Sequence, residues 1–287
     1  MKKILTRSIS GAIYVIIIVA SIYAGRWTGN STLGEVVFGA LFLILGIIGI
    51  YEVIKNLSIK GIKCNEPVAY IVGIISYLLV FLWEQPSFGE GQLWSFGLLT
   101  VVPAVMLCVF LLQLWRKDEN PFANIGYTLL PTIWVIIPLS LINTIHDTSD
   151  GFTMMIFILI WVNDTFAYLT GMLLGRHKMW VRHSPNKTWE GTVGGALFCI
   201  ATAIFVGPLL LGVQSQMLYT FDWIVIGLIC SVIGTLGDLV ESMFKRFCGV
   251  KDSGNIMPGH GGILDRFDSI LLAVPFILAY LTVVICS

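Results

Sequence analysis

Charge is what this sequence has little of. Only 12% of its 287 residues are Asp, Glu, Lys or Arg, whereas soluble domains carry about 25%. Hydrophobic residues make up 56% of the chain, and the mean hydropathy is +0.87. The composition therefore excludes an ordinary soluble domain and indicates a polytopic membrane protein whose surroundings are the lipid bilayer. No nucleic-acid partner is expected.

The sequence also lacks a cysteine framework, an internal repeat and a disordered tail. Its six cysteines stand at no metal-ligand or disulfide spacing, and most lie inside apolar segments, so we expect small core residues. They are Cys64, Cys108, Cys199, Cys230, Cys248 and Cys286. The start, MKKILTR, precedes an apolar run without a small-residue cleavage site, so we expect a first span rather than a signal peptide.

Long hydrophobic runs are what the sequence has in abundance. A membrane-spanning helix needs about 20 apolar residues, and nine segments approach that length. They cover about residues 8–25, 35–54, 68–83, 93–114, 126–143, 152–173, 190–212, 222–242 and 267–286. We therefore predict an all-α, polytopic integral membrane protein of about nine transmembrane helices.

The basic residues are sorted by side. With a cytoplasmic N-terminus and nine spans, every Lys and Arg except Arg26 lies in an inner loop, as the positive-inside rule requires. The inner residues are Lys2, Lys3, Arg7, Lys55, Lys60, Lys63, Arg116, Lys117, Arg176, Lys178, Arg182, Lys187, Lys245, Arg246, Lys251 and Arg266. The sorting predicts a multi-pass membrane protein, and we expect it in the cell (plasma) membrane.

Polar chemistry is distributed unevenly along the chain. The first 125 residues carry little of it, and functional residue types concentrate from about residue 160 onward. We expect an N-terminal transmembrane region of about four helices over 1–125. A catalytic region over 126–287 follows, with cytoplasmic loops at 174–189 and 243–266.

The most informative segment is a polar run, SMFKRFCGVKDSGNIMPGHGGILDRFDS, between two apolar segments at 242–269. Its Lys, Arg, His and Gly residues suit phosphate, and its aspartates suit the metal that accompanies phosphate. Just before and within the run, four polar residues share one helix face because they are spaced at i, i+3, i+4 and i+7: Asp238, Glu241, Ser242 and Lys245. A solvated helix end explains Lys245 and Arg246, but a carboxylate at Asp238 is too short to reach water and needs a partner or a cation.

Glycines surround His260 in this run, and Asp265 and Asp268 follow at the start of the last segment. Helix capping is the plain explanation for either aspartate. Asp238 and Asp265, however, lie near the ends of adjoining helices on the same side of the membrane, so they could share one Mg²⁺.

An upstream loop and one helix add further candidates. Lys187 and Glu190 stand where Ser184–Thr188 predicts a turn into a helix capped by Ser184 or Thr188, and helix starts favour phosphate. Asp164 lies inside an apolar segment, where an ionisable residue is a functional candidate. A buried Asp164 satisfied by a neighbouring helix stays an open alternative.

Three stretches together resemble the phosphatidate cytidylyltransferase family. The longest reads S-x-x-K-R-x4-K-D-x-G, then P-x-H-G-G-x-x-D-R-x-D, from Ser242 to Asp268. The second is S-P-N-K-T-W-E-G at 184–191, and the third is D-x-x-A-Y-x-x-G at 164–171. Met257, where the family prefers Leu, Ile or Phe, is a mild departure. The resemblance covers about residues 160–287.

The resemblance implies an enzyme that converts CTP and phosphatidic acid to CDP-diacylglycerol and pyrophosphate. It implies catalytic roles for Asp238, Asp265 and Lys245, with Mg²⁺ on the two aspartates and a second cation of unknown identity nearby. It also implies a set of substrate-binding residues: Ser184, Asn186, Lys187, Glu190, Arg246, Lys251, His260 and Arg266. Other candidates are Asp164, Glu241, Ser242, Asp252 and Asp268.

Two other functions are weighed against this one. A CDP-alcohol phosphatidyltransferase would carry D-G-x2-A-R-x8-G-x3-D-x3-D, a pattern that this sequence lacks. A secondary transporter for an anionic solute could use Asp164 and Asp238 as ion sites, but it should show interrupted helices in two related halves. The polar residues here gather in one half and on one predicted side. A homodimer is an open alternative.

Overall fold

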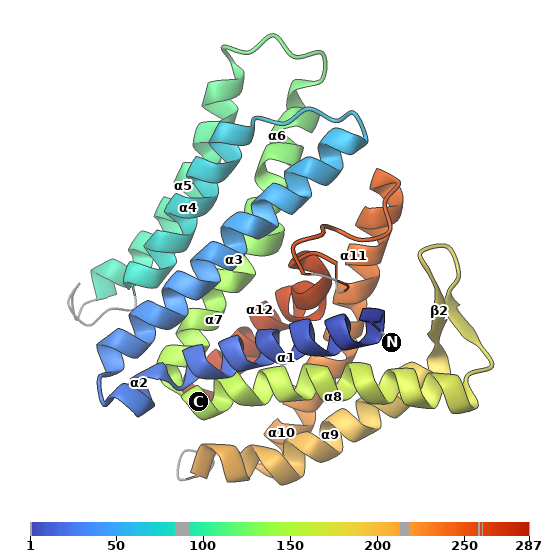
Figure 1. Ribbon diagram of the computed structural model, residues 1–287. Coiled ribbons are helices and arrows are strands. Elements are labelled where there is room, and N and C mark those ends of the chain that lie inside the picture. The colour runs from blue at the N-terminus through green and yellow to red at the C-terminus, as the bar shows by residue number, and fades with distance from the viewer. Residues whose placement is uncertain (1, 84–91, 213–217, 258, 260, 287) are drawn as a thin grey trace. The chain divides into compact units, whose positions relative to one another are not determined.

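The computed structural model describes residues 2–83, 92–212, 218–257, 259 and 261–286, and they are almost entirely helical. The chain divides into two compact units (Figure 1). The first comprises Met1–Asp147 and Cys248–Leu264, and the second comprises Thr148–Phe247 and Asp265–Ser287. This division by packing differs from the boundary near residue 125, which rests on where polar chemistry gathers and stays a prediction.

Helices packed through small residues make up the first unit. Its elements are α1 (Lys2–Ile22), α2 (Ala24–Thr28), α3 (Ser31–Ile59), α4 (Glu66–Trp83), α5 (Gln92–Gln113), α6 (Pro121–Pro131), η2 (Thr132–Ile136) and α7 (Ile137–Thr148). A side chain at Gly39 of α3 would overlap the Phe81 ring, and one at Gly49 would overlap Val135. Glycines thus bring these helices close, as small residues do in membranes.

Helices also dominate the second unit. Its elements are α8 (Asp150–Leu174), β1 (Lys178–Trp180), β2 (Ser184–Thr188), α9 (Trp189–Leu211), α10 (Thr220–Leu228), η4 (Ile229–Ile233), α11 (Gly234–Cys248) and α12 (Leu264–Cys286). Helices α8 and α9 run side by side (Figure 1). Gly191 allows this contact, because a side chain there would overlap the Ala167 carbonyl.

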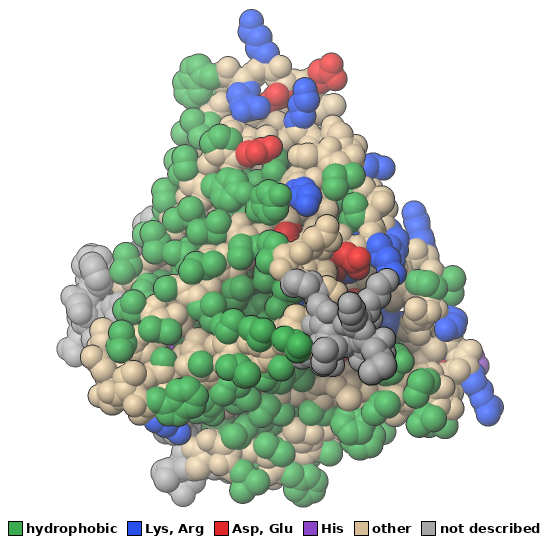
Figure 2. Space-filling view, in the orientation of Figure 1, with side chains coloured by type: hydrophobic (Ala, Val, Ile, Leu, Met, Phe, Trp, Pro, Cys, Tyr) green, Lys and Arg blue, Asp and Glu red, His purple; other side chains and the backbone are tan. Residues whose placement is uncertain are grey.

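The membrane character is confirmed, whereas the count of nine spans stays a prediction. Within the described residues, six helices are long and apolar enough to cross a membrane: Ser31–Ile59, Pro121–Thr148, Asp150–Leu174, Trp189–Leu211, Thr220–Cys248 and Leu264–Val284. Shorter apolar helices at Ile9–Ile22, Glu66–Leu82 and Pro103–Gln113 coincide with the other three expected segments. Figure 2 shows broad areas of hydrophobic side chain and few charged ones, as a lipid-facing surface requires.

The loop at 174–189 differs from the expected turn. It forms an antiparallel hairpin in which Lys178 pairs with Thr188 and Trp180 with Ser184. Residues 184–188 are therefore strand β2, and the helix begins only at Trp189. Of the two expected caps, Thr188 and not Ser184 caps α9, because the Thr188 Oγ1 accepts a hydrogen bond from Gly191 N at 3.2 Å. The pattern at Ser184–Thr188 contains the cap but no period-two hydrophobic alternation that would have indicated a strand.

Helices α11 and α12 approach each other closely. A side chain at Gly237 would lie 2.5 Å from the Asp268 carbonyl oxygen and 3.1 Å from Ser269 Cα. Gly237 directly precedes Asp238, so the close contact brings the carboxylates of the two helices together. This contact positions the site.

Candidate functional site

Three carboxylates from α11 and α12 meet in one place. One oxygen each of Asp238, Glu241 and Asp268 lies within 4.8 Å of the others. Glu241 is buried, with 1% of its surface exposed, while Asp238 and Asp268 are half-buried. Like charges so close together are costly away from water unless cations accompany them.

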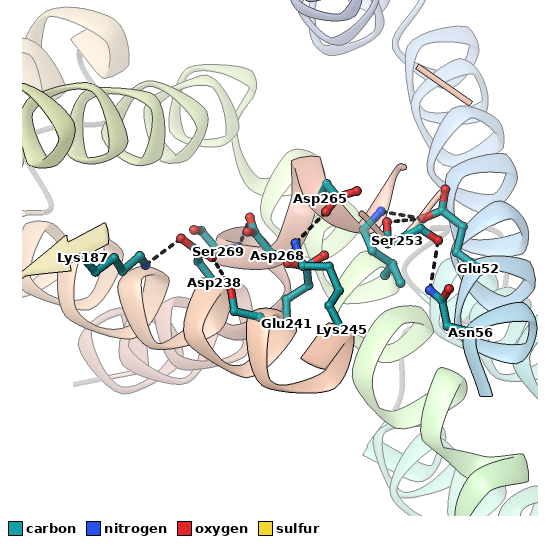
Figure 3. A network of polar contacts seen from close by, with 12 residues as sticks. Glu52, Asn56, Lys187, Asp238, Glu241, Lys245, Ser253, Asp265, Asp268 and Ser269 are labelled. Atoms are coloured by element: carbon teal, nitrogen blue, oxygen red, sulfur yellow. Dashed lines mark hydrogen bonds and ion pairs between the residues drawn. The ribbon is translucent and has the colours of Figure 1, made fainter. Parts of the chain in front are cut away.

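Two lysines supply part of that positive charge (Figure 3). Lys187 of β2 places its Nζ 2.6 Å from Asp238 Oδ2 and donates to the Thr235 carbonyl oxygen at 3.2 Å. Lys245 of α11 lies between two carboxylates, 2.5 Å from Glu241 Oε2 and 2.7 Å from Asp265 Oδ1. The hairpin, α11 and α12 are thus joined by ion pairs.

The predicted helix face of α11 is confirmed by its contacts. Lys245 pairs with Glu241 one turn before it, and Ser242 Oγ donates to Asp238 Oδ1 at 3.3 Å. All four residues lie on the side of α11 that carries the ion pairs. The helical period was sufficient to predict this face from sequence.

The partners of the two α12 aspartates differ from those that the motif suggested. Asp265, expected beside Asp238, is paired with Lys245. Asp268 instead joins Asp238 and Glu241, and it accepts a hydrogen bond from Ser269 N at 2.7 Å. Spacing along the chain could not distinguish the two aspartates, because both belong to the first turns of α12.

Asp164 belongs to the same surroundings. It lies on α8 with an exposed side chain, and the charges of Asp238, Lys187 and Arg266 act on it. The neighbouring Asn163 is buried and donates to Thr235 Oγ1 at 3.4 Å. The side chain of Asp164 also interacts with that of Asn163, so an aspartate satisfied by its neighbours stays an open alternative.

The donor set fits a divalent cation. The side chains linked above comprise five carboxylates (Asp164, Asp238, Glu241, Asp265 and Asp268) and three basic groups (Lys187, Lys245 and Arg266). Formally, two negative charges remain. Within the described part of the chain, Oε1 of buried Glu241 also has no hydrogen-bond partner. An oxygen-only set with excess negative charge suits Mg²⁺.

The other candidates from the hairpin have structural neighbours. Glu190 accepts hydrogen bonds from the backbone N–H groups of Arg176 and His177, and its Oε1 lies 2.5 Å from His177 Nδ1. It therefore links the segment just before β1 to the start of α9. Ser184 is half-buried and Asn186 exposed on β2.

The remaining candidates lie in or beside the loop between α11 and α12. Arg246, Lys251 and Asp252 are exposed, and Arg266 is half-buried. His260 lies outside the described residues. Met257 N donates to Gly261 O at 3.0 Å, which closes the loop there. Gly259 and Gly261 have φ of +79° and +86°, a conformation that favours glycine.

Sequence reasoning missed Glu52. This residue of α3 is fully buried in the first unit, contrary to the expectation of little polar chemistry before residue 125. Its carboxylate accepts hydrogen bonds from Ser253 Oγ and from the N–H groups of Ile263 and Leu264, each at 2.9 Å. A carboxylate inside an apolar segment was itself a signal for a partner.

Comparison with known proteins agrees with these motifs. The sequence model of the cytidylyltransferase family matches residues 5–284. A phosphatidate cytidylyltransferase of Staphylococcus aureus (strain COL) is 35% identical over 241 residues, covering 82% of this chain and 85% of the relative. One of Bacillus subtilis (strain 168) is 33% identical over 250 residues, covering 85% and 88%. The likeness extends through the N-terminal half, where the motifs alone indicated only hydrophobicity.

Proposed function

The chain belongs to the cytidylyltransferase family, and from this premise we propose that it transfers the cytidylyl group of CTP to phosphatidic acid. A phosphate oxygen of phosphatidic acid attacks the α-phosphorus of CTP. The bond from that phosphorus to the oxygen bridging to the β-phosphate breaks, and pyrophosphate leaves. The product is CDP-diacylglycerol, in keeping with the printed names of the two bacterial relatives.

One observation carries the proposal beyond the family name. Lys187 of one motif stretch and Asp268 of another meet in the second unit at Asp238, which lies just before the longest stretch. A site for two polyanionic substrates needs this mixture of fixed basic groups and carboxylates able to hold a cation. The pattern of a CDP-alcohol phosphatidyltransferase is absent from the sequence, and the polar residues do not lie in the two related halves expected of a transporter.

The chain's own residues bind and orient phosphate in this mechanism. Lys187 and Lys245 place ammonium groups beside the carboxylates, where they can neutralise the triphosphate and the lipid phosphate. Arg246, Lys251 and Arg266 add positive charge from α11, the loop and α12. The phosphate nucleophile is already ionised near pH 7, so no side chain has to act as a strong general base.

The best-supported cation ligands are Asp238, Glu241 and Asp268, the carboxylates that converge. A Mg²⁺ ion bound there supplies charge neutralisation at the reacting phosphates. Asp265 remains a motif-based ligand candidate, and its partner Lys245 would have to move aside for that role. A second cation nearby is compatible with the excess of carboxylates.

We place the site on the cytoplasmic side of the cell membrane. CTP is a cytosolic polyanion that does not cross lipid, and the positive-inside sorting puts the basic loops on that side. Phosphatidic acid would reach the site sideways from the bilayer.

The decisive experiment uses the full-length protein purified in detergent. It is given CTP labelled in the cytidine and phosphatidic acid, with and without Mg²⁺, and lipid-soluble label and pyrophosphate are measured. Both products should form in equal amounts, only with Mg²⁺, and not when ATP replaces CTP. Absence of labelled lipid at saturating Mg²⁺ contradicts the proposed function, and release of CMP from added CDP-diacylglycerol and an alcohol would favour a phosphatidyltransferase.

A further inference from the structure

The buried carboxylate of Glu52 accepts three hydrogen bonds from one distant segment of the chain. Figure 3 shows it on α3 with Ser253 and Asn56 beside it. Its Oε1 accepts from Ile263 N, and its Oε2 accepts from Leu264 N and Ser253 Oγ, each at 2.9 Å. Asn56, one turn along α3, donates through Nδ2 to the Ser253 carbonyl oxygen at 2.9 Å. Two residues of α3 thus hold both ends of segment 253–264.

The segment is shaped to receive this carboxylate. A side chain on Gly254 or on Gly262 would overlap the Glu52 carboxylate oxygens. Gly254 and Gly262 are both buried. Glycine is therefore required at both positions for the backbone to approach the carboxylate, in addition to any role of the loop toward phosphate.

The two N–H groups bound by Glu52 lie at the start of α12. Ile263 and Leu264 are the last residue before α12 and its first residue, so their N–H groups are among those that a helix start leaves without internal partners. A carboxylate at that point satisfies them and fixes where the helix begins. The next residue in the chain is Asp265, and Asp268 follows within the same first turns.

We propose that Glu52 is a positioning residue for the reaction: it fixes segment 253–264 and the start of α12, and thereby the register of Asp265 and Asp268. This inference rests on the proposed function for its catalytic consequence, but not for the anchoring itself. Glu52 acts through the loop and touches no substrate. Residues that orient metal-binding groups in this way typically affect metal affinity or activity by about 10- to 100-fold.

The test compares Glu52→Gln with the wild type in three measurements. A glutamine side chain keeps its shape but offers one acceptor oxygen instead of two, so at least one of the two N–H groups loses its partner. Backbone amide hydrogen exchange at Ile263 and Leu264 should accelerate about 10-fold or more. The kcat should fall about 10- to 100-fold, and the Mg²⁺ concentration for half-maximal rate should rise about 10-fold.

Two further variants make the result decisive. Ser253→Ala removes a single hydrogen bond to Glu52 and should change the same measurements in the same direction by a smaller factor, and it serves if Glu52→Gln fails to fold. Glu66→Gln removes an exposed acidic side chain at the start of α4 and should leave all three measurements unchanged.

The outcomes separate this inference from the proposed function. Unchanged exchange at Ile263 and Leu264 overturns the anchoring. A lower kcat with an unchanged Mg²⁺ requirement overturns the positioning role, because loss of folded protein alone would produce that result. A wild type without cytidylyl transfer refutes the proposed function, while the exchange measurement still decides whether Glu52 fixes the helix start.

Discussion

Acidic residues are paired in two different ways in the two units of this protein. In the second unit, Glu241 and Asp238 are balanced by the long, flexible ammonium side chains of Lys245 and Lys187. In the first unit, Glu52 accepts hydrogen bonds from two backbone N–H groups and one hydroxyl. The side-chain amide of Asn56 holds the same loop through the Ser253 carbonyl oxygen. The difference is between partners that can move and partners that are part of the backbone.

These two kinds of partner suit two different roles, binding ligands and holding the structure in place. Lysine ammonium groups can turn from a carboxylate to an incoming phosphate while a metal cation takes their place, so the carboxylates of α11 and α12 can take part in a binding cycle. Backbone donors at a helix start cannot turn away independently, because they move only with the helix itself. A carboxylate bound to them is suited to hold a structure in place.

The largest effect should come from removing an exchangeable carboxylate. Asp238→Asn should lower kcat at least about 1,000-fold, because losing a ligand that neutralises transferring phosphate costs several kcal/mol of transition-state stabilisation. The variant should still insert and purify. Steady-state assays across a Mg²⁺ series measure this effect, with exposed Glu119→Gln as the matched control for loss of one acidic charge. Near wild-type activity at saturating Mg²⁺ would remove Asp238 from the ligand set.

The next effect concerns the pair formed by Lys245 and Asp265. Asp265→Asn and Lys245→Ala should each lower kcat about 100-fold, and the double variant should lose little more than either single one. Side chains that act as one ion pair show this non-additive behaviour. A double-mutant cycle on kcat/KM for CTP measures it. If the two losses multiply, Asp265 acts separately from Lys245, as expected of a direct metal ligand.

Much of this arrangement could be predicted from the sequence, because it depends on local spacing. The helix period placed Asp238, Glu241 and Lys245 on one face. Capping preference narrowed the cap of α9 to Ser184 or Thr188, and the structure has Thr188 there. Hydrophobic length located the helices that are apolar enough to span a bilayer. These features need no knowledge of which segments meet.

The rest depends on contacts between distant segments. Nothing in the spacing of Asp265 and Asp268 indicates which one Lys245 will bind, because the answer depends on how α12 is packed against α11 at Gly237. Lys187 pairs with a residue 51 positions away, and Ile263 binds a residue 211 positions away. Such pairings are set by tertiary structure, so the sequence could name the residues but not their partners.

A smaller effect should follow from shortening the lysine on the hairpin. Lys187→Ala should lower kcat/KM for CTP about 10-fold without reducing expression. The substitution removes one ammonium group that can bind phosphate, and it leaves the carboxylates in place. Lys178→Ala is the matched control, since Lys178 lies exposed on the neighbouring strand of the same hairpin. Equal kinetics in the two variants would show that Lys187 has no role in binding CTP beyond that of any basic residue in an inner loop.

The last prediction concerns topology, namely whether the hairpin and the loop at 249–263 lie on the same side of the membrane. In a cysteine-free background, Asn186→Cys in the hairpin and Asn255→Cys in the loop held by Glu52 should both react with an impermeant thiol reagent only from the cytoplasmic side. Both side chains are exposed, and the charge sorting assigns their flanking basic residues to the inner side. A cysteine at Ser287, which lies outside the described residues, should react from the opposite side if the chain crosses the membrane nine times, because an odd number of spans puts the two chain ends on opposite sides. Labelling of Ser287→Cys from the cytoplasm would therefore rule out an odd number of spans with a cytoplasmic N-terminus. Labelling of Asn186→Cys only from outside would separate the hairpin from cytosolic CTP, and the proposed function would then have to be abandoned.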